Sequence, residues 1–265
     1  MEPCYDITVL SHMTIPFTIH LVTTKPLDPY LKKETIDQID QFLARINRDY
    51  SPFLESSFVR QHPQMGQVVP TFLLQNQEYQ AIFAQCLLMQ EKSAGIFDPF
   101  YSGTYDPTGL VKGWAIEEAF FRYLQPLLDT NQLIAASING GGDMQVGAKE
   151  QVDFSWKIGI EHPTKTGIIA TYTLKNGAIA TSGNTKRGQH VASGRDLRQQ
   201  VTVLAPYLSL ADCWATVGLA TDDQHFQTFI KQEKLTGIVY LNEHHTYQFQ
   251  QGGITYDTQS SLSCE

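Results

Sequence analysis

VDFSWKIGI (residues 152–160) and IIATYTL (residues 168–174) are two strand-like runs joined through PTKTG (residues 163–167), and the fold class can be inferred from them. Both runs are rich in β-branched and aromatic residues, and apolar and polar positions partly alternate, which is typical of strands. The proline and glycine between them favour a turn, so we expect an antiparallel hairpin. Such a hairpin favours an α+β fold over a doubly wound parallel sheet.

The rest of the chain reads as strands and helices without repeats or low-complexity tracts. We expect one domain over residues 1–265, with mixed or antiparallel sheets and flanking helices. Its first part, about 1–130, is expected to be rich in helix, and its second part, about 131–265, rich in sheet. Strands are predicted at 15–22, 135–139, 152–160, 168–175, 178–181 and 201–205, and helices at 32–47, 77–91, 113–127, 210–219 and 222–234.

Composition limits the classes of function that the chain can have. The 265 residues are 42% hydrophobic, enough to bury a large core, and the net charge of −8 argues against general affinity for nucleic acid or an anionic membrane. The four cysteines show no CxxC spacing, so we expect free thiols in a reducing compartment. The first residues are acidic and no apolar segment reaches membrane length, so we expect a cytoplasmic location without membrane insertion.

The segment Asp106-Pro107-Thr108-Gly109-Leu110-Val111-Lys112-Gly113-Trp114-Ala115 is the clearest candidate for an anion site. The glycines allow close approach of the main chain, Lys112 supplies a positive charge, and the start of a helix favours an anion. The spacing matches neither GxxxxGK[ST] nor GxGxxG, so the common nucleotide-binding folds are not supported. An ordinary tight loop before a helix is the alternative interpretation.

Further motifs follow this segment along the chain. Asn139-Gly140-Gly141-Gly142-Asp143 ends a predicted strand, and Asp143 is interpreted either as a site carboxylate or as the closing residue of an Asx turn. Ala180–Asn184 and Arg187–Val191 come next. In the predicted helix 210–219, Asp212 and Thr216 lie one turn apart on the same side, and a carboxylate and hydroxyl so placed suit a hard cation such as Mg²⁺.

Taken in this order, the motifs resemble those of the ApbE family, the FAD:protein FMN transferases. The family's G-x-A-K-G, N-x-G-G-D, A-T-S-G and A-D-x-x-[AS]-T patterns are similar to segments here, as are a W-x-[IV]-G-I-x-x-P strand and a histidine segment. Weaker similarity covers the N-terminal part, from about Met13. The matching segments are 108–113, 139–143, 156–163, 180–183, 188–191 and 211–216, with 11–14, 50–53 and 95–99 as the weaker ones.

The resemblance implies phosphoryl transfer: FAD is cleaved at its pyrophosphate, AMP leaves, and FMN is esterified to a threonine or serine of an acceptor protein. It implies Mg²⁺, or Mn²⁺ in its place, held by Asp212, Thr216 and the backbone carbonyl of Val111, and His190 as the base that takes the acceptor's proton. The residues implied to contact FAD are Met13, Phe53, Ile96, Phe97, Asp98, Thr108, Lys112, Thr181 and Ser182.

Two other functions fit the same residues. An FAD pyrophosphatase would use water in place of the acceptor and release FMN and AMP, and its metal and pyrophosphate sites would be the same. A flavin-binding protein without turnover is the third hypothesis. It is favoured by one departure from the family, because Ala192–Asp196 follows His190 where the family has D-P-x-x-G.

Overall fold

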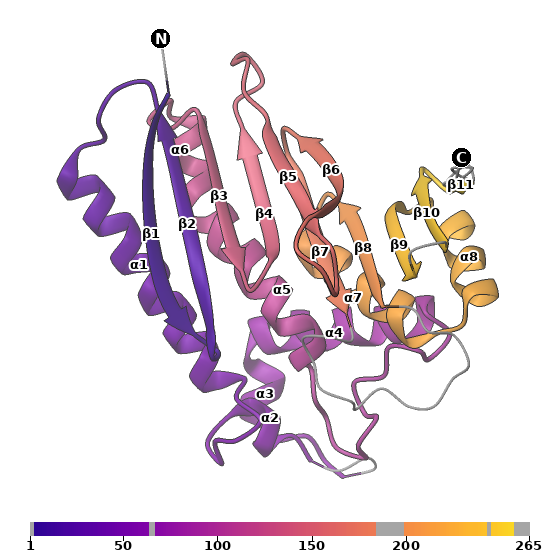
Figure 1. The fold of residues 1–265 in the computed structure, drawn as a ribbon. Coiled ribbons are helices and arrows are strands. Elements are labelled where there is room, and N and C mark those ends of the chain that lie inside the picture. Colours follow the sequence, from indigo (N-terminus) through magenta and orange to yellow (C-terminus); the bar gives the residue numbers. More distant parts are fainter. Residues whose placement is uncertain (1–2, 64–66, 184–198, 243–244, 257–265) are drawn as a thin grey trace, which may run out of the picture.

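The computed structural model describes residues 3–63, 67–183, 199–242 and 245–256. Its centre is a sheet of nine strands in the order β1-β2-β3-β4-β7-β8-β9-β10-β11, and a separate two-stranded sheet joins β5 and β6 (Figure 1). All neighbouring strands in both sheets are antiparallel. The strands are β1 Cys4–His12, β2 Ile15–Thr23, β3 Ala135–Gly140, β4 Asp143–Ala148, β5 Trp156–Glu161, β6 Ile168–Leu174, β7 Gly177–Gly183, β8 Gln200–Ala205, β9 Thr236–Asn242, β10 His245–Gln250 and β11 Gly253–Tyr256. The predicted α+β class and the hairpin that decided it are confirmed.

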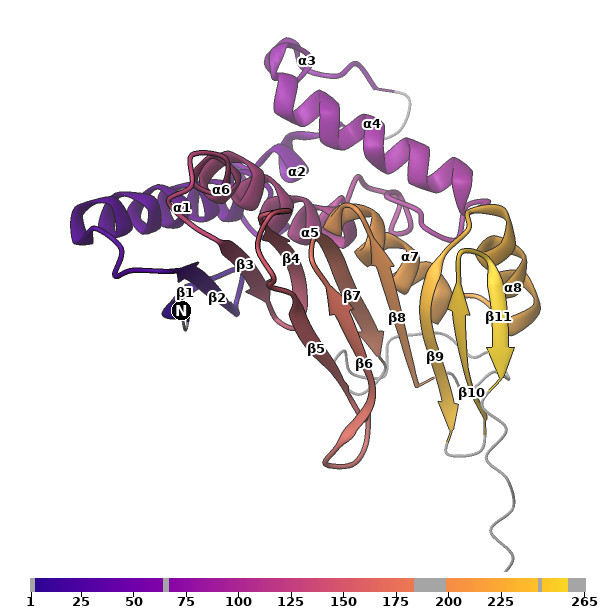
Figure 2. The ribbon, with the colours of Figure 1, turned by 90° about the horizontal axis from the view of Figure 1, so that it is seen from above.

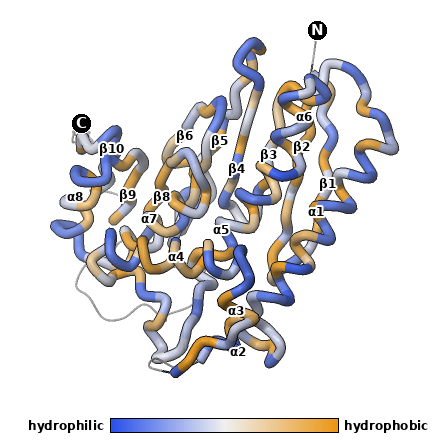
Figure 3. The backbone as a smooth tube through the Cα atoms, turned by 180° about the vertical axis from the view of Figure 1, so that it is seen from behind, coloured by the Kyte–Doolittle hydropathy of each residue, from blue (hydrophilic) through white to orange (hydrophobic). Residues whose placement is uncertain are grey.

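The helices gather on one face of the large sheet, with α5 and α7 directly against it and α4 in a further layer (Figure 2). The α-helices are α1 Pro29–Asp49, α2 Phe58–Gln61, α3 Thr71–Gln75, α4 Gln77–Lys92, α5 Thr108–Ala119, α6 Gln125–Asp129, α7 Leu208–Ala220 and α8 Asp223–Gln232, and a π-helical turn, Phe120–Leu124, joins α5 to α6. Figure 3 shows α7 mainly in hydrophobic colours and α1 mainly in hydrophilic ones, as expected for a central and a peripheral helix.

Local sequence explains where the peripheral helices begin. The side chain of Asp28 accepts a hydrogen bond from the backbone N–H of Tyr30 at 2.7 Å, and Pro29 follows as the first helical residue of α1. Asn76 caps α4 in the same way through Tyr79, and Asp222 caps α8 through His225. Along α1, Ile39, Phe42, Leu43 and Ile46 recur at helical spacing and enter the core.

Alternation along the strands divides apolar side chains between the two faces of the sheet. Phe17, Ile19 and Leu21 of β2 enter the main core beneath the helices. Val22 points to the opposite face, where a smaller cluster forms with Ala135 and Ala148, and Phe154 and Trp156 pack against it. The helices therefore cover one face of the sheet, and the segment that leads into β5 covers part of the other.

Some predicted boundaries are wrong. Helix α5 begins at Thr108 and not at Gly113, so the supposed glycine–lysine loop forms its first two turns. The predicted helix 113–127 is interrupted by the π-helical turn, and the strand predicted from Val152 begins at Trp156. Strands β1, β4, β9 and β10 were not predicted. None of the helices in the described part of the chain has the length and apolar composition needed to cross a membrane.

Candidate active site

Helix α5 carries the glycine–lysine segment against helix α7. A Cβ atom placed on Gly113 would lie 3.1 Å from the carbonyl oxygen of Leu208 and 3.2 Å from Oδ2 of Asp212. These distances are shorter than ordinary van der Waals contact, so a side chain at this position would require Leu208 or Asp212 to shift. Gly113 therefore brings the beginning of α5 within reach of Asp212, which the sequence places about one hundred residues later.

Lys112 lies between two buried carboxylates. Its Nζ forms a short ion pair with Oδ2 of Asp143 and lies 3.3 Å from Oδ2 of Asp212. Asp143 is 2% exposed and Asp212 is 1% exposed, whereas the Lys112 side chain keeps partial contact with solvent. Buried carboxylates require a compensating charge, and within the described residues the Lys112 ammonium supplies it to both carboxylates.

Asp143 is held at the tight turn between β3 and β4. Gly141 and Gly142 have positive φ angles of 66° and 106°, and the N–H of Gly142 donates to the Asn139 side chain at 2.9 Å. Asn139 is therefore the residue whose side chain fastens the turn. The Asp143 carboxylate accepts a hydrogen bond at 2.8 Å from the backbone N–H of Thr181, where β7 extends beyond the end of β4.

Asp212 and Thr216 occur one turn apart on α7, as predicted. The hydroxyl of Thr216 lies 3.2 Å from that of Ser182 at the end of β7. The neighbouring Thr181 hydroxyl points to the other face of the sheet, where it is 2.9 Å from the Thr202 hydroxyl. Ser182 thus contributes its side chain to this group of residues, and Thr181 contributes its backbone N–H.

Two side chains from other elements fix the beginning of α7. Glu117 of α5 accepts hydrogen bonds from the backbone N–H of Ser209 at 2.9 Å and from its hydroxyl at 2.7 Å. Gln145 of β4 accepts from the N–H of Leu208 at 3.1 Å. Burial raises the pKa of the Glu117 carboxyl, and the bonds from Ser209 oppose this shift. These contacts satisfy free N–H groups of α7 and set the position of Asp212 one turn further on.

The side chains able to hold a cation here are oxygen donors. Asp212 supplies a carboxylate and Thr216 a hydroxyl, and both types suit Mg²⁺. Within residues 3–63, 67–183, 199–242 and 245–256, no group of three or more His, Cys, Asp or Glu side chains forms a metal cluster. Burial raises the pKa of the adjacent Cys213 thiol well above its usual value, and a soft sulfur ligand does not suit a hard cation such as Mg²⁺.

The family model described as the ApbE family matches residues 103–239, just over half of the chain. This chain belongs to the ApbE family. The match contains Lys112, Asp143, Ser182, Asp212 and Thr216, which the fold brings together from four separate elements. The predicted family is confirmed.

Solved ApbE structures share the fold at low sequence identity. The flavin transferase ApbE from Vibrio cholerae is 13% identical with a TM-score of 0.74, covering 98% of this chain and 99% of that one. The flavinyl transferase ApbE from Pseudomonas stutzeri is also 13% identical with a TM-score of 0.74, covering 98% and 96%. An ApbE protein from Thermotoga maritima is 18% identical with a TM-score of 0.69 and 97% coverage of both chains. None of the curated proteins matches this chain.

The other residues singled out in the sequence lie in different surroundings. Phe97 is buried and packs on the first turn of α5, where a Cβ on Gly109 would be 3.3 Å from its ring. Asp98 accepts hydrogen bonds from the Gln90 side chain and the Phe100 N–H, and Thr108 donates to Asp106. Phe53 is 88% exposed and Ile96 is also exposed, whereas Met13 is half-buried in the β1–β2 turn. His190 lies outside the described residues.

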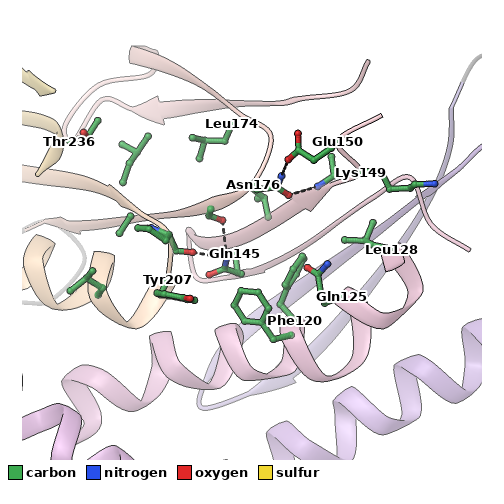
Figure 4. A pocket seen from close by; sticks show the side chains of 18 of the residues that line it. Phe120, Gln125, Leu128, Gln145, Lys149, Glu150, Leu174, Asn176, Tyr207 and Thr236 are labelled. Carbon is green, nitrogen blue, oxygen red and sulfur yellow. Dashed lines mark hydrogen bonds between the residues drawn. The ribbon is translucent and has the colours of Figure 1, made fainter. Parts of the chain in front are cut away.

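A large pocket of about 1220 Å³ lies away from these residues (Figure 4). Phe120, Gln145 and Tyr207 line it together with the ends of β4 and β8 that are distant from Asp143 and Ser182. Gln145 there donates to the carbonyl groups of Gly177 and Pro206 while it accepts from Leu208, so it fastens strands to the beginning of α7. We therefore place the candidate active site at Lys112 and not in this pocket.

Proposed function

We propose that this chain is a Mg²⁺-dependent FAD:protein FMN transferase that attaches FMN to a threonine or serine of an acceptor protein and releases AMP. The observation that carries the proposal is the position of Lys112 between the buried carboxylates of Asp143 and Asp212. Thr216 follows Asp212 one helical turn later on α7. The names of the Vibrio and Pseudomonas structures, both flavin transferases, support it.

Lys112 and a divalent cation would share the charge of the pyrophosphate. The Asp212 carboxylate and the Thr216 hydroxyl are hard oxygen donors one helical turn apart, so the residues fit Mg²⁺ or Mn²⁺. The carbonyl of Val111, in the first turn of α5, is the proposed third ligand. When bound, the cation would stabilise the negative charge that develops on the phosphate oxygens. Asp143 would hold the Lys112 ammonium in position.

The transfer step exchanges one P–O bond for another. The oxygen of the acceptor hydroxyl bonds to the phosphorus on the flavin side, the bond from that phosphorus to the bridging oxygen breaks, and AMP leaves with the bridging oxygen. His190 is the proposed base that takes the hydroxyl proton. Met13, Phe53, Ile96, Phe97 and Asp98 are proposed to contact the rings and ribose of FAD, with Thr108 and Ser182 supplying polar groups. Thr181 would act through its backbone N–H, which donates to the Asp143 carboxylate.

A reducing, cytoplasmic setting is the proposed place of action. The three cysteines in the described part of the chain, Cys4, Cys86 and Cys213, are free thiols, which agrees with a reducing compartment. An acceptor protein met there would complete the reaction.

The test is incubation of the purified protein with FAD and Mg²⁺, with and without a candidate acceptor, while AMP release and covalent flavin fluorescence on a denaturing gel are followed. We expect fluorescence on the acceptor only when acceptor and Mg²⁺ are both present. Release of AMP and free FMN without acceptor would instead indicate a pyrophosphatase. Binding of FAD without product, with several acceptors, would indicate a flavin-binding protein.

Asp212→Asn tests the cation site directly. It is expected to lower transfer by about two orders of magnitude, since the carboxylate that would hold the cation opposite the developing phosphate charge is lost. Mg²⁺ should also raise the unfolding temperature of the parent protein but not that of the variant, because ligand binding stabilises only the state that binds it. Asp153→Asn, an exposed change, is the control. Equal stabilisation of parent and Asp212→Asn by Mg²⁺ would remove Asp212 from the proposed ligands.

A further inference from the structure

Strand β1 is a long edge strand that lacks three features that often protect an edge, namely lysine, proline and a bulge. It spans nine residues at one end of the sheet, and among the described strands it pairs with β2 alone. The strand contains neither lysine nor proline, and its register against β2 has no bulge. Natural edge strands are commonly protected by lysine, proline or a bulge, because an open edge can pair with another chain.

The backbone groups of alternate β1 residues point away from β2. In β2, the carbonyl of Val22 accepts from the N–H of Ile134 at 2.8 Å, so it points toward β3. Val22 is opposite Tyr5, and bonded and non-bonded pairs alternate along an antiparallel ladder. The N–H and C=O groups of Tyr5, Ile7 and Val9 therefore face the open side of the sheet.

The side chains of the same three residues form an apolar stripe on the face of the sheet opposite the helices. Tyr5, Ile7 and Val9 are each more than half exposed, and the ring of Phe154 lies 6.5 Å from that of Tyr5. On the helix side of β1, Asp6 is paired with Lys32 at 2.6 Å. The open edge thus combines outward-facing backbone N–H and C=O groups with apolar side chains, and its Asp6 carboxylate is neutralised by Lys32.

We propose that β1 is the interface with a second copy of this chain, which pairs with it in antiparallel direction about a two-fold axis at Ile7. In this register Ile7 is opposite Ile7 of the second copy and Tyr5 is opposite Val9. The outward N–H and C=O groups of all three residues then find partners. The symmetry is that of an isologous dimer, in which the same patch is used twice.

The remaining side chains are compatible with this register. Asp6 is opposite Thr8 and Cys4 is opposite Leu10, so no like charges meet. Pro3, which has no N–H to donate, is opposite Ser11 and ends the ladder. The two apolar stripes become adjacent on one face, and the sheets of the two copies become continuous. In this register β1 therefore pairs with a second copy of itself without opposing like charges.

A disulfide cross-link tests the register. In a Cys4→Ser background, Ile7→Cys places two thiols opposite each other at the axis, where Cα atoms of a paired strand position lie roughly 5.5 Å apart, within disulfide range. Val9→Cys is the matched control, because its own counterpart would lie about four residues, or roughly 13 Å, away. We expect a covalent dimer on a non-reducing gel for Ile7→Cys alone. No cross-link, or equal cross-linking of both variants, would overturn the register.

Ile7→Pro tests the interface without cross-linking. Proline removes an N–H that points outward and leaves the bonds to β2 intact, so an edge strand tolerates it. Sedimentation over a range of concentrations should show a monomer–dimer equilibrium for the parent protein and a monomer for Ile7→Pro, with the thermal unfolding of both followed by circular dichroism. A parent protein that stays monomeric at high concentration, or a dimer that survives in folded Ile7→Pro, would overturn the proposal.

Discussion

At the scale of single residues, Lys112 is the group on which two buried charges depend. Among the described residues, it is the cation that lies beside both Asp143 and Asp212. Replacement by methionine keeps most of the side-chain volume and removes the charge. We expect Lys112→Met to lower the free energy of unfolding by about 3 kcal/mol, because it removes one partner of the buried ion pair with Asp143. Urea denaturation of the two proteins measures the difference.

The double variant Lys112→Met with Asp143→Asn provides the control. Asparagine keeps an oxygen for the Thr181 N–H and removes one of the two carboxylate charges. Residues in one ion-pair network couple, so the double variant should be more stable than the sum of the two single effects predicts. If the effect of the double variant on the free energy of unfolding equalled the sum of the two single effects, Lys112 and Asp143 would not act as a pair.

At the scale of elements, the contact of α5 with α7 sets the shape of the site. Gly113 lies where any side chain would meet the Leu208 carbonyl and Asp212. We expect Gly113→Ala to destabilise the protein by about 1–3 kcal/mol through overpacking, although alanine is the better helix former by about 1 kcal/mol. The helices would move apart and displace Asp212, so Mg²⁺ should stabilise the variant less than the parent protein. Thermal unfolding with and without Mg²⁺ measures both effects.

Gly109→Ala in the same helix is the matched variant. Its new methyl group would meet only the edge of the Phe97 ring, at 3.3 Å, and a side chain can move where a backbone cannot. We expect Gly109→Ala to be close to neutral because the gain in helix propensity offsets the tighter contact. Equal destabilisation by both changes would mean that the approach of α5 to α7 is not the cause.

At the scale of the whole molecule, the sequence predicted elements whose side chains alternate or recur at helical spacing. Strand β2 and helix α1 show such patterns and were predicted within a few residues. Strand β4 was missed because most of its residues are buried, including Gly147 and Ala148, which leaves little alternation. The beginning of α5 was misplaced because Gly109 and Gly113 read as a loop, whereas packing against α7 requires Gly113 inside a helix.

The candidate site divides in a similar way. The spacing of Asp212 and Thr216 within one helix is a local property, and the sequence was sufficient to predict it. The ion pair of Lys112 with Asp143 joins residues 31 positions apart and depends on which strand lies beside α5. The Glu117 contact with Ser209 spans 92 positions and left no signal in the sequence. Such contacts follow from the order of strands in the sheet, which residue patterns alone do not fix.

Two half-buried histidines link the stability of the whole molecule to pH. His62 lies among the rings of Phe83, Phe100 and Tyr105 and forms a short hydrogen bond with the Tyr79 hydroxyl. His20, on the helix-free face, is 3.1 Å from the Ser137 hydroxyl. Burial lowers the pKa of both imidazoles from the ordinary value of 6.5, since it disfavours the charged form.

A lowered pKa in the folded state means that the unfolded chain binds protons first as the pH falls. The stability that the neutral histidines contribute is therefore present above pH 6.5 and is lost as the pH falls from 6.5 through their folded pKa values. The raised pKa of Glu117 has the opposite effect on the pH dependence of stability. The contribution of a histidine is therefore seen only when a histidine variant is compared with the parent protein. We expect the free energy of unfolding, measured with urea between pH 5 and pH 8, to fall less steeply with acid in His62→Phe than in the parent protein. In the double variant His62→Phe with His20→Phe, the free energy of unfolding should depend on pH even less. Identical pH dependence in all three proteins would contradict this account.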